Sequence, residues 1–142
     1  MIICRELKLG EEARASEIEH ECLSTAWSEE QLKALPEYAV YLGAFEGETM
    51  CGIGSMYILF DEAQILNVAV SEKFRKRGFG KKILDVLLKT AEEKGAKTIT
   101  LEVAQDNLNA ISLYEKCGFS AVGVRKGFYA GKDAIAMLKE VF

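Results

Sequence analysis

Residues 68–81 read Val68-Ala69-Val70-Ser71-Glu72-Lys73-Phe74-Arg75-Lys76-Arg77-Gly78-Phe79-Gly80-Lys81, an apolar strand that leads through a basic turn into a helix. Two glycines, Gly78 and Gly80, stand directly before a long apolar stripe at helical spacing. The first turn of a helix leaves backbone N–H groups without internal partners, and the helix dipole makes that end positive. Glycines let a phosphate approach these amides closely. The stretch therefore predicts an anion-binding turn.

Two common glycine-rich phosphate motifs do not fit this turn. The dinucleotide fingerprint G-x-G-x-x-G needs glycine at Ile83, and the P-loop needs glycine at Arg75 and serine or threonine at Lys82. The letters do fit R-x-x-G-x-G from Arg75 to Gly80. A cluster this local suits a compact polyphosphate, although a solvated basic turn would carry the same residues. The cluster is Lys73, Arg75, Lys76, Arg77, Lys81 and Lys82.

The rest of the chain predicts a mixed α/β fold. Short apolar or β-branched segments indicate strands at residues 1–7, 39–45, 50–59, 63–70, 98–103, 119–124 and 134–141. Helical spacing indicates helices at residues 11–23, 28–36, 79–95 and 110–117. Ser28 with Gln31 makes a capping-box pattern, and Asn107 is a candidate N-cap. The order βααβββαβαββ predicts a mixed sheet covered by helices.

Length and composition predict one domain that spans residues 1–142. The 142 residues are 49% hydrophobic and 28% charged, which is usual for one globular domain. No basic start with an apolar stretch marks a signal peptide, and no apolar run reaches membrane-spanning length. We expect a cytoplasmic protein with no membrane partner. Four widely spaced cysteines and one histidine predict reduced thiols and no metal site.

Charge is distributed unevenly along the chain. Residues 1–50 carry 4 basic and 11 acidic side chains, whereas residues 51–142 carry 14 basic and 11 acidic ones. The net charge of -4 and the short basic cluster argue against a nucleic-acid-binding face.

Further blocks of sequence resemble one family. They are Ala26-Trp27-Ser28, Asn67-Val68-Ala69-Val70, Leu101-Glu102-Val103, Asn107, Leu113-Tyr114-Glu115-Lys116-Cys117-Gly118-Phe119 and Asp133-Ala134-Ile135-Ala136-Met137. With the R-x-x-G-x-G turn they resemble the GNAT superfamily of N-acetyltransferases. The likeness is to its RimI-type branch, the N-terminal alanine acetyltransferases of ribosomal proteins. It covers roughly residues 25–137 in order and implies a GNAT fold, an enzyme, and acetyl-CoA as co-substrate.

The resemblance implies roles for particular residues. Tyr114 would be the general acid beside the thioester sulfur, and Glu102 would be the base, directly or through water. A backbone amide among Val68, Ala69 and Val70 would hold the thioester oxygen. Asn107 would bond the pantetheine arm. The pyrophosphate would bind at Arg75, Lys76, Arg77, Gly78, Phe79, Gly80 and Lys81.

Each of the three polar assignments has a structural alternative. Tyr114 shares a helical face with Ala110, Ile111 and Cys117, so it could be an amphipathic core residue. Glu102 could be a solvated strand residue, and Asn107 could be a helix cap alone. Direct transfer needs an unprotonated amine, a polarised carbonyl and a proton for the thiolate, and these three tasks favour the catalytic interpretation.

The acceptor is expected to be a protein N-terminus, in the first place that of a ribosomal protein. An α-amine has a reference pKa of about 7.7–8.0 against about 10.4 for lysine, so one modest base suffices for it. The resemblance implies that Trp27 and Tyr129 contact the peptide, and the acidic first half suits a basic tail. Two positions differ from the branch: Ala104 replaces a frequent basic residue and Phe128 replaces a tyrosine.

Two other functions remain open at this point. One is a GNAT enzyme that acetylates a small-molecule amine or a lysine side chain. The other is a non-catalytic acyl-CoA-binding sensor, which would keep the turn at Arg75 to Lys81 without needing Tyr114 or Glu102.

Overall fold

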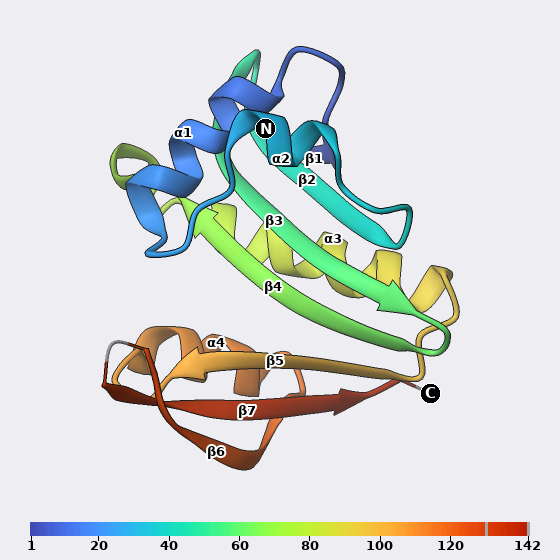
Figure 1. Ribbon diagram of the computed structural model, residues 1–142, viewed down its shortest axis with the longest axis vertical. Helices are drawn as coiled ribbons and strands as arrows, with labels where there is room; N and C mark the ends of the chain where they lie inside the picture. The colour runs from blue at the N-terminus through green and yellow to red at the C-terminus, as the bar shows by residue number, and fades with distance from the viewer. Residues whose placement is uncertain (130, 142) are drawn as a thin grey trace.

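A sheet with the strand order β1-β2-β3-β4-β5-β7-β6 runs through the computed structural model, which describes residues 1–129 and 131–141 (Figure 1). The strands are β1 (Ile2–Glu6), β2 (Ala39–Glu46), β3 (Thr49–Leu59), β4 (Glu62–Val70), β5 (Thr98–Ala104), β6 (Ser120–Tyr129) and β7 (Lys132–Glu140). The helices are α1 (Glu12–Cys22), α2 (Glu29–Lys33), α3 (Phe79–Glu93) and α4 (Leu108–Lys116), with a 3₁₀ turn η1 at Glu72–Phe74. The predicted order βααβββαβαββ and the mixed α/β class are confirmed.

Local signals in the sequence account for several of the helix boundaries. The Ser28 hydroxyl accepts from the Gln31 N–H at 3.1 Å, and the Gln31 side chain accepts from the Ser28 N–H at 2.8 Å, which confirms the capping box. Asn107 caps α4 through its side-chain oxygen, 3.2 Å from the Ala110 N–H. Both caps use partners three residues away, so the sequence alone predicts them.

The sheet consists of two parts that meet at one short parallel contact. Strands β1 to β4 pair antiparallel, and β5, β7 and β6 also pair antiparallel. Between the two parts, β4 and β5 pair in parallel only from Glu62–Thr98 to Gln64–Thr100. Beyond that contact the two strands diverge, as Figure 1 shows. The divergence leaves one edge of β4 without a neighbouring strand.

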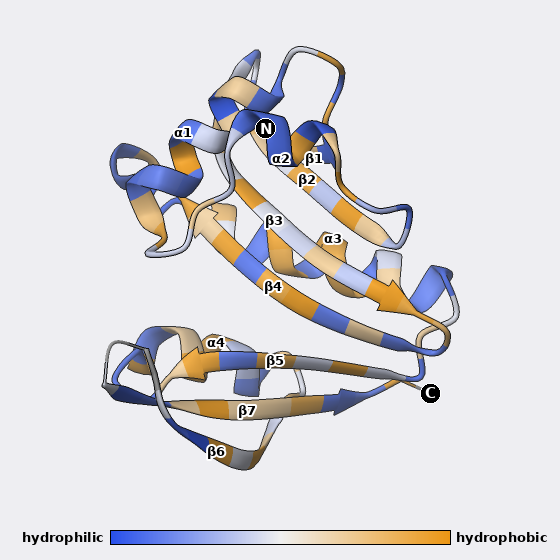
Figure 2. Ribbon diagram, viewed as in Figure 1, coloured by the Kyte–Doolittle hydropathy of each residue, from blue (hydrophilic) through white to orange (hydrophobic). Residues whose placement is uncertain are grey.

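Apolar side chains form a core on each face of the sheet. Helix α3 buries Phe79, Ile83, Leu84, Leu87 and Ala91 against one face, and residues of α4 pack against the same core. Helices α1 and α2 cover the other face, over a cluster that includes Ile18, Leu32, Tyr41 and Ile53. Figure 2 shows hydrophobic residues along much of β3 and in parts of β4, whereas α2 is mostly hydrophilic. In the described residues no helix is long and apolar enough to cross a membrane.

Close packing of α3 on β3 depends on glycine at position 54. A Cβ on Gly54 would overlap Cγ2 of the buried Ile83 and lie 3.2 Å from Leu87 Cδ1. We expect Gly54→Ala to lower the free energy of unfolding by about 1–3 kcal/mol, because the well-packed core must shift to admit a methyl group. Chemical denaturation measures the change.

Gly123 on β6 is the matched control for this prediction. A Cβ there meets no described heavy atom within 4 Å, so Gly123→Ala should leave stability unchanged or raise it slightly. Equal stability of the two variants would contradict the packing argument.

Candidate active site

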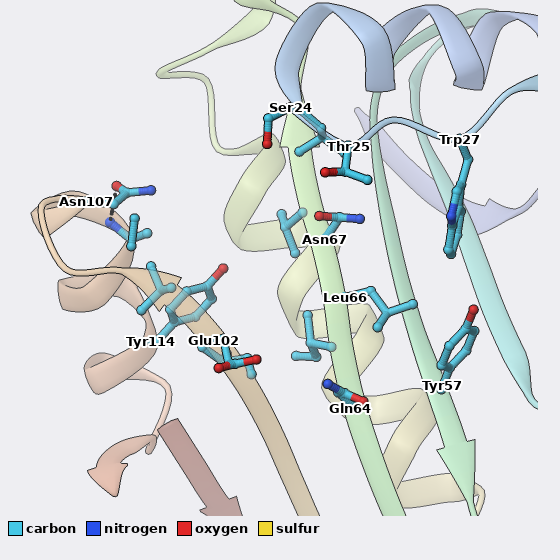
Figure 3. A pocket seen from close by; sticks show the side chains of 17 residues that line it. Ser24, Thr25, Trp27, Tyr57, Gln64, Leu66, Asn67, Glu102, Asn107 and Tyr114 are labelled. Carbon is cyan, nitrogen blue, oxygen red and sulfur yellow. Dashed lines mark hydrogen bonds between the residues drawn. The ribbon is translucent and has the colours of Figure 1, made fainter. Parts of the chain in front are cut away.

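A pocket of about 500 Å³ opens where β4 and β5 diverge. One wall comes from β4 and the other from β5 and α4, while the segment between α1 and α2 contributes Leu23, Ser24, Thr25 and Trp27. Five sequence-predicted residues line it together: Trp27, Val68, Glu102, Asn107 and Tyr114. Figure 3 shows Tyr114 and Glu102 on one side of this space and Asn67 and Leu66 on the other. The fold thus joins residues that are far apart in the sequence.

The β4 wall contains a bulge that exposes backbone groups. The register with β3 shifts between Ser55 and Met56, which pair with Asn67 and Ile65, so Leu66 is the extra residue. After the bulge the peptide groups alternate between β3 and the open edge. The Ser71 N–H donates to Cys51 on β3, whereas the Val70 carbonyl accepts from Arg75 Nε at 2.9 Å. By the same alternation the Val68 N–H and carbonyl point toward the open edge.

The three predicted backbone donors are therefore not equivalent. Val68 lines the pocket and presents its amide to it. Ala69 pairs with Ile53, so its N–H points toward β3 and away from the pocket. Its side chain is buried under α1, and Ala69 therefore offers no donor to the pocket. Val70 also faces the open edge, but its carbonyl holds Arg75 and the Cys22 thiol, 3.4 Å away.

Tyr114 and Glu102 stand on the same wall of the pocket. The Tyr114 ring packs edge-on against Phe119, with centroids 5.9 Å apart, which fixes the direction of the hydroxyl. Glu102 has a side chain 23% exposed and accepts from Arg125 Nη1 at 3.1 Å. Tyr114 packs against the core, as the amphipathic alternative expects, and it lines the pocket as well. Glu102 lines the pocket and is only partly exposed, so it is not a fully solvated strand residue.

Asn107 is both a helix cap and a pocket-lining residue, although the sequence left the cap and a binding role as alternatives. It caps α4 with its carboxamide oxygen, and it lines the pocket as well. Because the cap occupies the oxygen, the Asn107 amide nitrogen is the end that can donate to a bound molecule.

The predicted phosphate turn follows β4 and does not line the pocket itself. Lys76 and Gly78 have φ of 63° and 89°, and α3 begins directly afterwards. Left-handed residues in a turn direct successive N–H groups to one side and form a concavity for anions. The first turn of α3 carries no acidic residue that would repel a phosphate. The turn therefore fits a pyrophosphate at the N-terminus of α3.

Side chains in this turn differ in what they can contribute. The Phe79 side chain is 1% exposed and belongs to the core, so only its backbone can meet a ligand. Arg77 is paired with Glu46, and Lys81 donates to Asp85 at 2.8 Å. Arg75 folds back onto the Val70 carbonyl. Each of these three cations has an internal partner. Only the Lys81–Asp85 pair, four residues apart on one helix, could be read from the sequence.

Aromatic residues line the part of the pocket formed by the segment between α1 and α2 and by β3. Trp27 lies 6.3 Å from Tyr41 and 6.5 Å from Tyr57 between ring centroids, and Trp27 and Tyr57 line the pocket (Figure 3). The side chain of Tyr129, the other predicted peptide contact, lies outside the described residues, as does that of Phe128.

Sequence reasoning missed several lining residues. Among them are Ser24, Thr25, Tyr57, Gln64, Leu66 and Asn67. Ser24 and Thr25 adjoin Trp27 in the sequence, which was a usable signal. Tyr57 and Gln64 had none, because only the pairing of β3 with β4 brings them to this wall.

Known proteins are similar to this chain in sequence and in fold. Residues 10–119 match the model of the acetyltransferase (GNAT) family. The ribosomal protein bS18-alanine N-acetyltransferase of Haemophilus influenzae is 34% identical over 130 residues, which cover 91% of this chain and 88% of that protein.

Solved structures extend the likeness over nearly the whole chain. The crystal structure of the ribosomal-protein-S18-alanine N-acetyltransferase from Escherichia coli has a TM-score of 0.90 at 28% identity and covers 99% of this chain and 94% of its own. Ard1 from Thermoplasma volcanium has a TM-score of 0.87 at 24% identity, covering 99% of this chain and 98% of its own, and at that identity shows the fold alone.

Proposed function

The chain belongs to the GNAT family of acetyltransferases, and from that premise we propose that it acetylates the N-terminal α-amine of a protein, first of all a ribosomal protein. It is an enzyme that uses acetyl-CoA, as its family does. The observation that carries the proposal is the pocket between β4 and β5, which Tyr114, Glu102, Val68 and Trp27 line together. A ribosomal acceptor would place the reaction in the cytoplasm.

The pocket residues divide the chemistry among them. Acetyl-CoA supplies a thioester whose carbonyl carbon is open to attack. The Val68 N–H faces the pocket and would hold the oxygen that becomes negative. Glu102 would take one proton from the ammonium, directly or through water, to give the neutral amine that attacks. Tyr114 would give its proton to the departing thiolate, and the second proton that the nitrogen loses would restore the Tyr114 hydroxyl. The new C–N bond forms as the C–S bond breaks, with no acyl-enzyme.

The anion-binding turn and Asn107 would orient the co-substrate. Phosphates on the amides at the start of α3 would direct the thioester along the open edge of β4. Asn107 at the head of α4 would donate its amide nitrogen to the pantetheine arm. Holding acetyl-CoA at its phosphates and at its pantetheine arm reduces the conformational entropy that would otherwise be lost on reaching the transition state.

The acceptor side favours a peptide with a basic tail. Trp27 forms the wall where the chain passes into α2, whose first turn carries Glu29 and Glu30. Acidic residues there would attract positive side chains that follow the acetylated residue. The relatives named for a ribosomal protein alanine support alanine as the first residue to try.

A peptide panel tests the proposed acceptor. The enzyme is incubated with acetyl-CoA and peptides that vary at the first residue and carry internal lysines, together with free small-molecule amines. Mass spectrometry is expected to find acetylation at the N-terminus, strongest for alanine. Acetylated lysines or free amines with untouched N-termini would contradict the proposal, and an absence of coenzyme A release with every amine would favour a non-catalytic sensor.

A further inference from the structure

Helix α1 carries three glutamates near its end, and each lies in a different environment. Residues two apart lie on nearly opposite sides of a helix, so Glu19 faces the core while Glu17 and Glu21 face outward. Glu19 is 1% exposed. The Glu17 side chain is 68% exposed and touches only Arg14, at 3.5 Å, among the ion pairs of the described residues. Glu21 is exposed as well, yet it reaches the start of the phosphate turn.

Glu19 holds the segment that forms the acceptor wall. One carboxylate oxygen accepts from the Trp27 N–H at 2.8 Å, and the other accepts from the Tyr41 hydroxyl at 2.5 Å. The Ser16 hydroxyl donates to the Trp27 carbonyl at 2.8 Å. Burial and the hydrogen bond to Glu19 raise the pKa of Tyr41 well above its usual range, so Tyr41 stays a donor.

This attachment matters because the wall has no regular structure of its own. Residues 23–28 belong to no helix or strand, and Trp27 depends on α1 for both of its backbone hydrogen bonds described here. A buried carboxylate is costly even when hydrogen-bonded, and an apolar residue of similar size often serves stability as well. The position of Trp27 is therefore the clearest gain from having glutamate at residue 19.

Glu21 holds the other side of the site. Its carboxylate accepts from the Ser71 hydroxyl at 2.8 Å and from the Glu72 N–H at 2.7 Å, where β4 passes into η1. These backbone and side-chain hydrogen bonds lower the pKa of Glu21, which keeps it ionised. Ser71 is itself 3% exposed and is fixed to Cys51 on β3 through its N–H. The turn at residues 75–81 follows directly.

We propose that α1 positions the two substrates through separate side chains: Glu19 is a positioning residue for the acceptor wall at Trp27, and Glu21 is one for the acetyl-CoA turn. The inference rests on the proposed function, because it assigns Trp27 to the acceptor and residues 75–81 to acetyl-CoA. Although Glu19 and Glu21 lie two positions apart on one helix, a change at Glu19 should affect the acceptor and a change at Glu21 should affect acetyl-CoA binding.

The same substitution at three positions tests the separation. Glu19→Leu should raise the KM of the acceptor about tenfold and leave the Kd of acetyl-CoA within about twofold, since the loss of charged hydrogen bonds is confined to one wall. Glu21→Leu should raise the Kd of acetyl-CoA about tenfold and change the acceptor KM little. Glu17→Leu, which keeps helix propensity and changes only the outer surface, should change neither constant. Calorimetry with acetyl-CoA alone and steady-state kinetics measure the constants.

A second variant protects the test against misfolding at residue 19. Ser16→Ala removes the hydrogen bond to the Trp27 carbonyl while keeping the core carboxylate, and it should raise the acceptor KM by a smaller factor with acetyl-CoA binding unchanged. If Glu19→Leu, Ser16→Ala and Glu21→Leu all raise the acceptor KM and the Kd of acetyl-CoA in the same ratio, α1 acts only as general support and the inference is wrong. The acceptor used is whichever amine the wild-type enzyme acetylates in the panel, so failure of the N-terminal proposal is a distinct result.

Discussion

Tyr114→Phe should lower kcat by about 10²- to 10⁴-fold while the Kd of acetyl-CoA changes little, because the variant removes only the proton that the departing thiolate needs. The phenylalanine ring keeps the edge-on contact with Phe119, so the fold and the pocket wall should persist. Stopped assays of coenzyme A release and calorimetry separate the two quantities.

Tyr38→Phe is the matched control for the loss of a tyrosine hydroxyl. Tyr38 is 41% exposed, lies outside the pocket lining, and packs its ring on Tyr57 at 5.0 Å. Its variant should keep kcat within about twofold, because Tyr38 is exposed and does not itself line the pocket. A Tyr114→Phe enzyme with unchanged kcat would remove Tyr114 from the mechanism.

Glu102→Gln should lower kcat/KM at pH 7 by about 10²- to 10⁴-fold, because glutamine cannot accept the proton of the attacking amine. The deficit should shrink as the pH rises from about 7 to 9, since the α-amine, with a reference pKa of about 7.7–8.0, then becomes neutral without a base. A pH profile of kcat/KM for both enzymes measures this. A deficit that stays constant across the range would indicate a structural role.

Arg125→Gln separates the lost base from the lost ion pair. The Arg125 side chain is 61% exposed and donates to Glu102 at 3.1 Å. Exposed pairs contribute roughly 0–1 kcal/mol, so this variant should lose no more than about fivefold in kcat/KM. A loss as large as that of Glu102→Gln would mean that the pair, rather than the carboxylate alone, is required.

In the predicted phosphate turn, residues 75–81, the number of basic residues overstates how many cations are available to a ligand. The basic cluster predicted a polyphosphate site, and the left-handed turn before α3 fits one. Yet Arg77 pairs with Glu46 and Arg75 holds the Val70 carbonyl, so the backbone amides carry more of the predicted binding than the charges suggest. Cations can be counted in a sequence, but the partner of Arg77 lies on β2, more than thirty residues earlier in the chain.

Strand β4 shows a second limit of prediction from the sequence. The block Asn67 to Val70 pointed to a backbone donor without saying which residue supplies it. The bulge at Leu66 and the pairing of Ala69 with Ile53 leave the Val68 amide toward the pocket. A bulge shifts every later residue to the other edge or face, and no local pattern in β4 marks its place.

The amino-acid sequence was sufficient to predict the element order, the capping box at Ser28, the cap at Asn107 and a basic turn before α3. These features depend on side-chain spacing and on hydrogen bonds between near neighbours, which the order of residues specifies directly. Packing between distant segments sets the remaining features: Glu19 accepts from the Trp27 N–H, Ala69 turns away from the pocket, and Tyr57 joins the pocket wall. Those outcomes follow from the early end of the β4–β5 pairing and from the packing of α1 on the sheet, which are contacts between segments far apart in the chain.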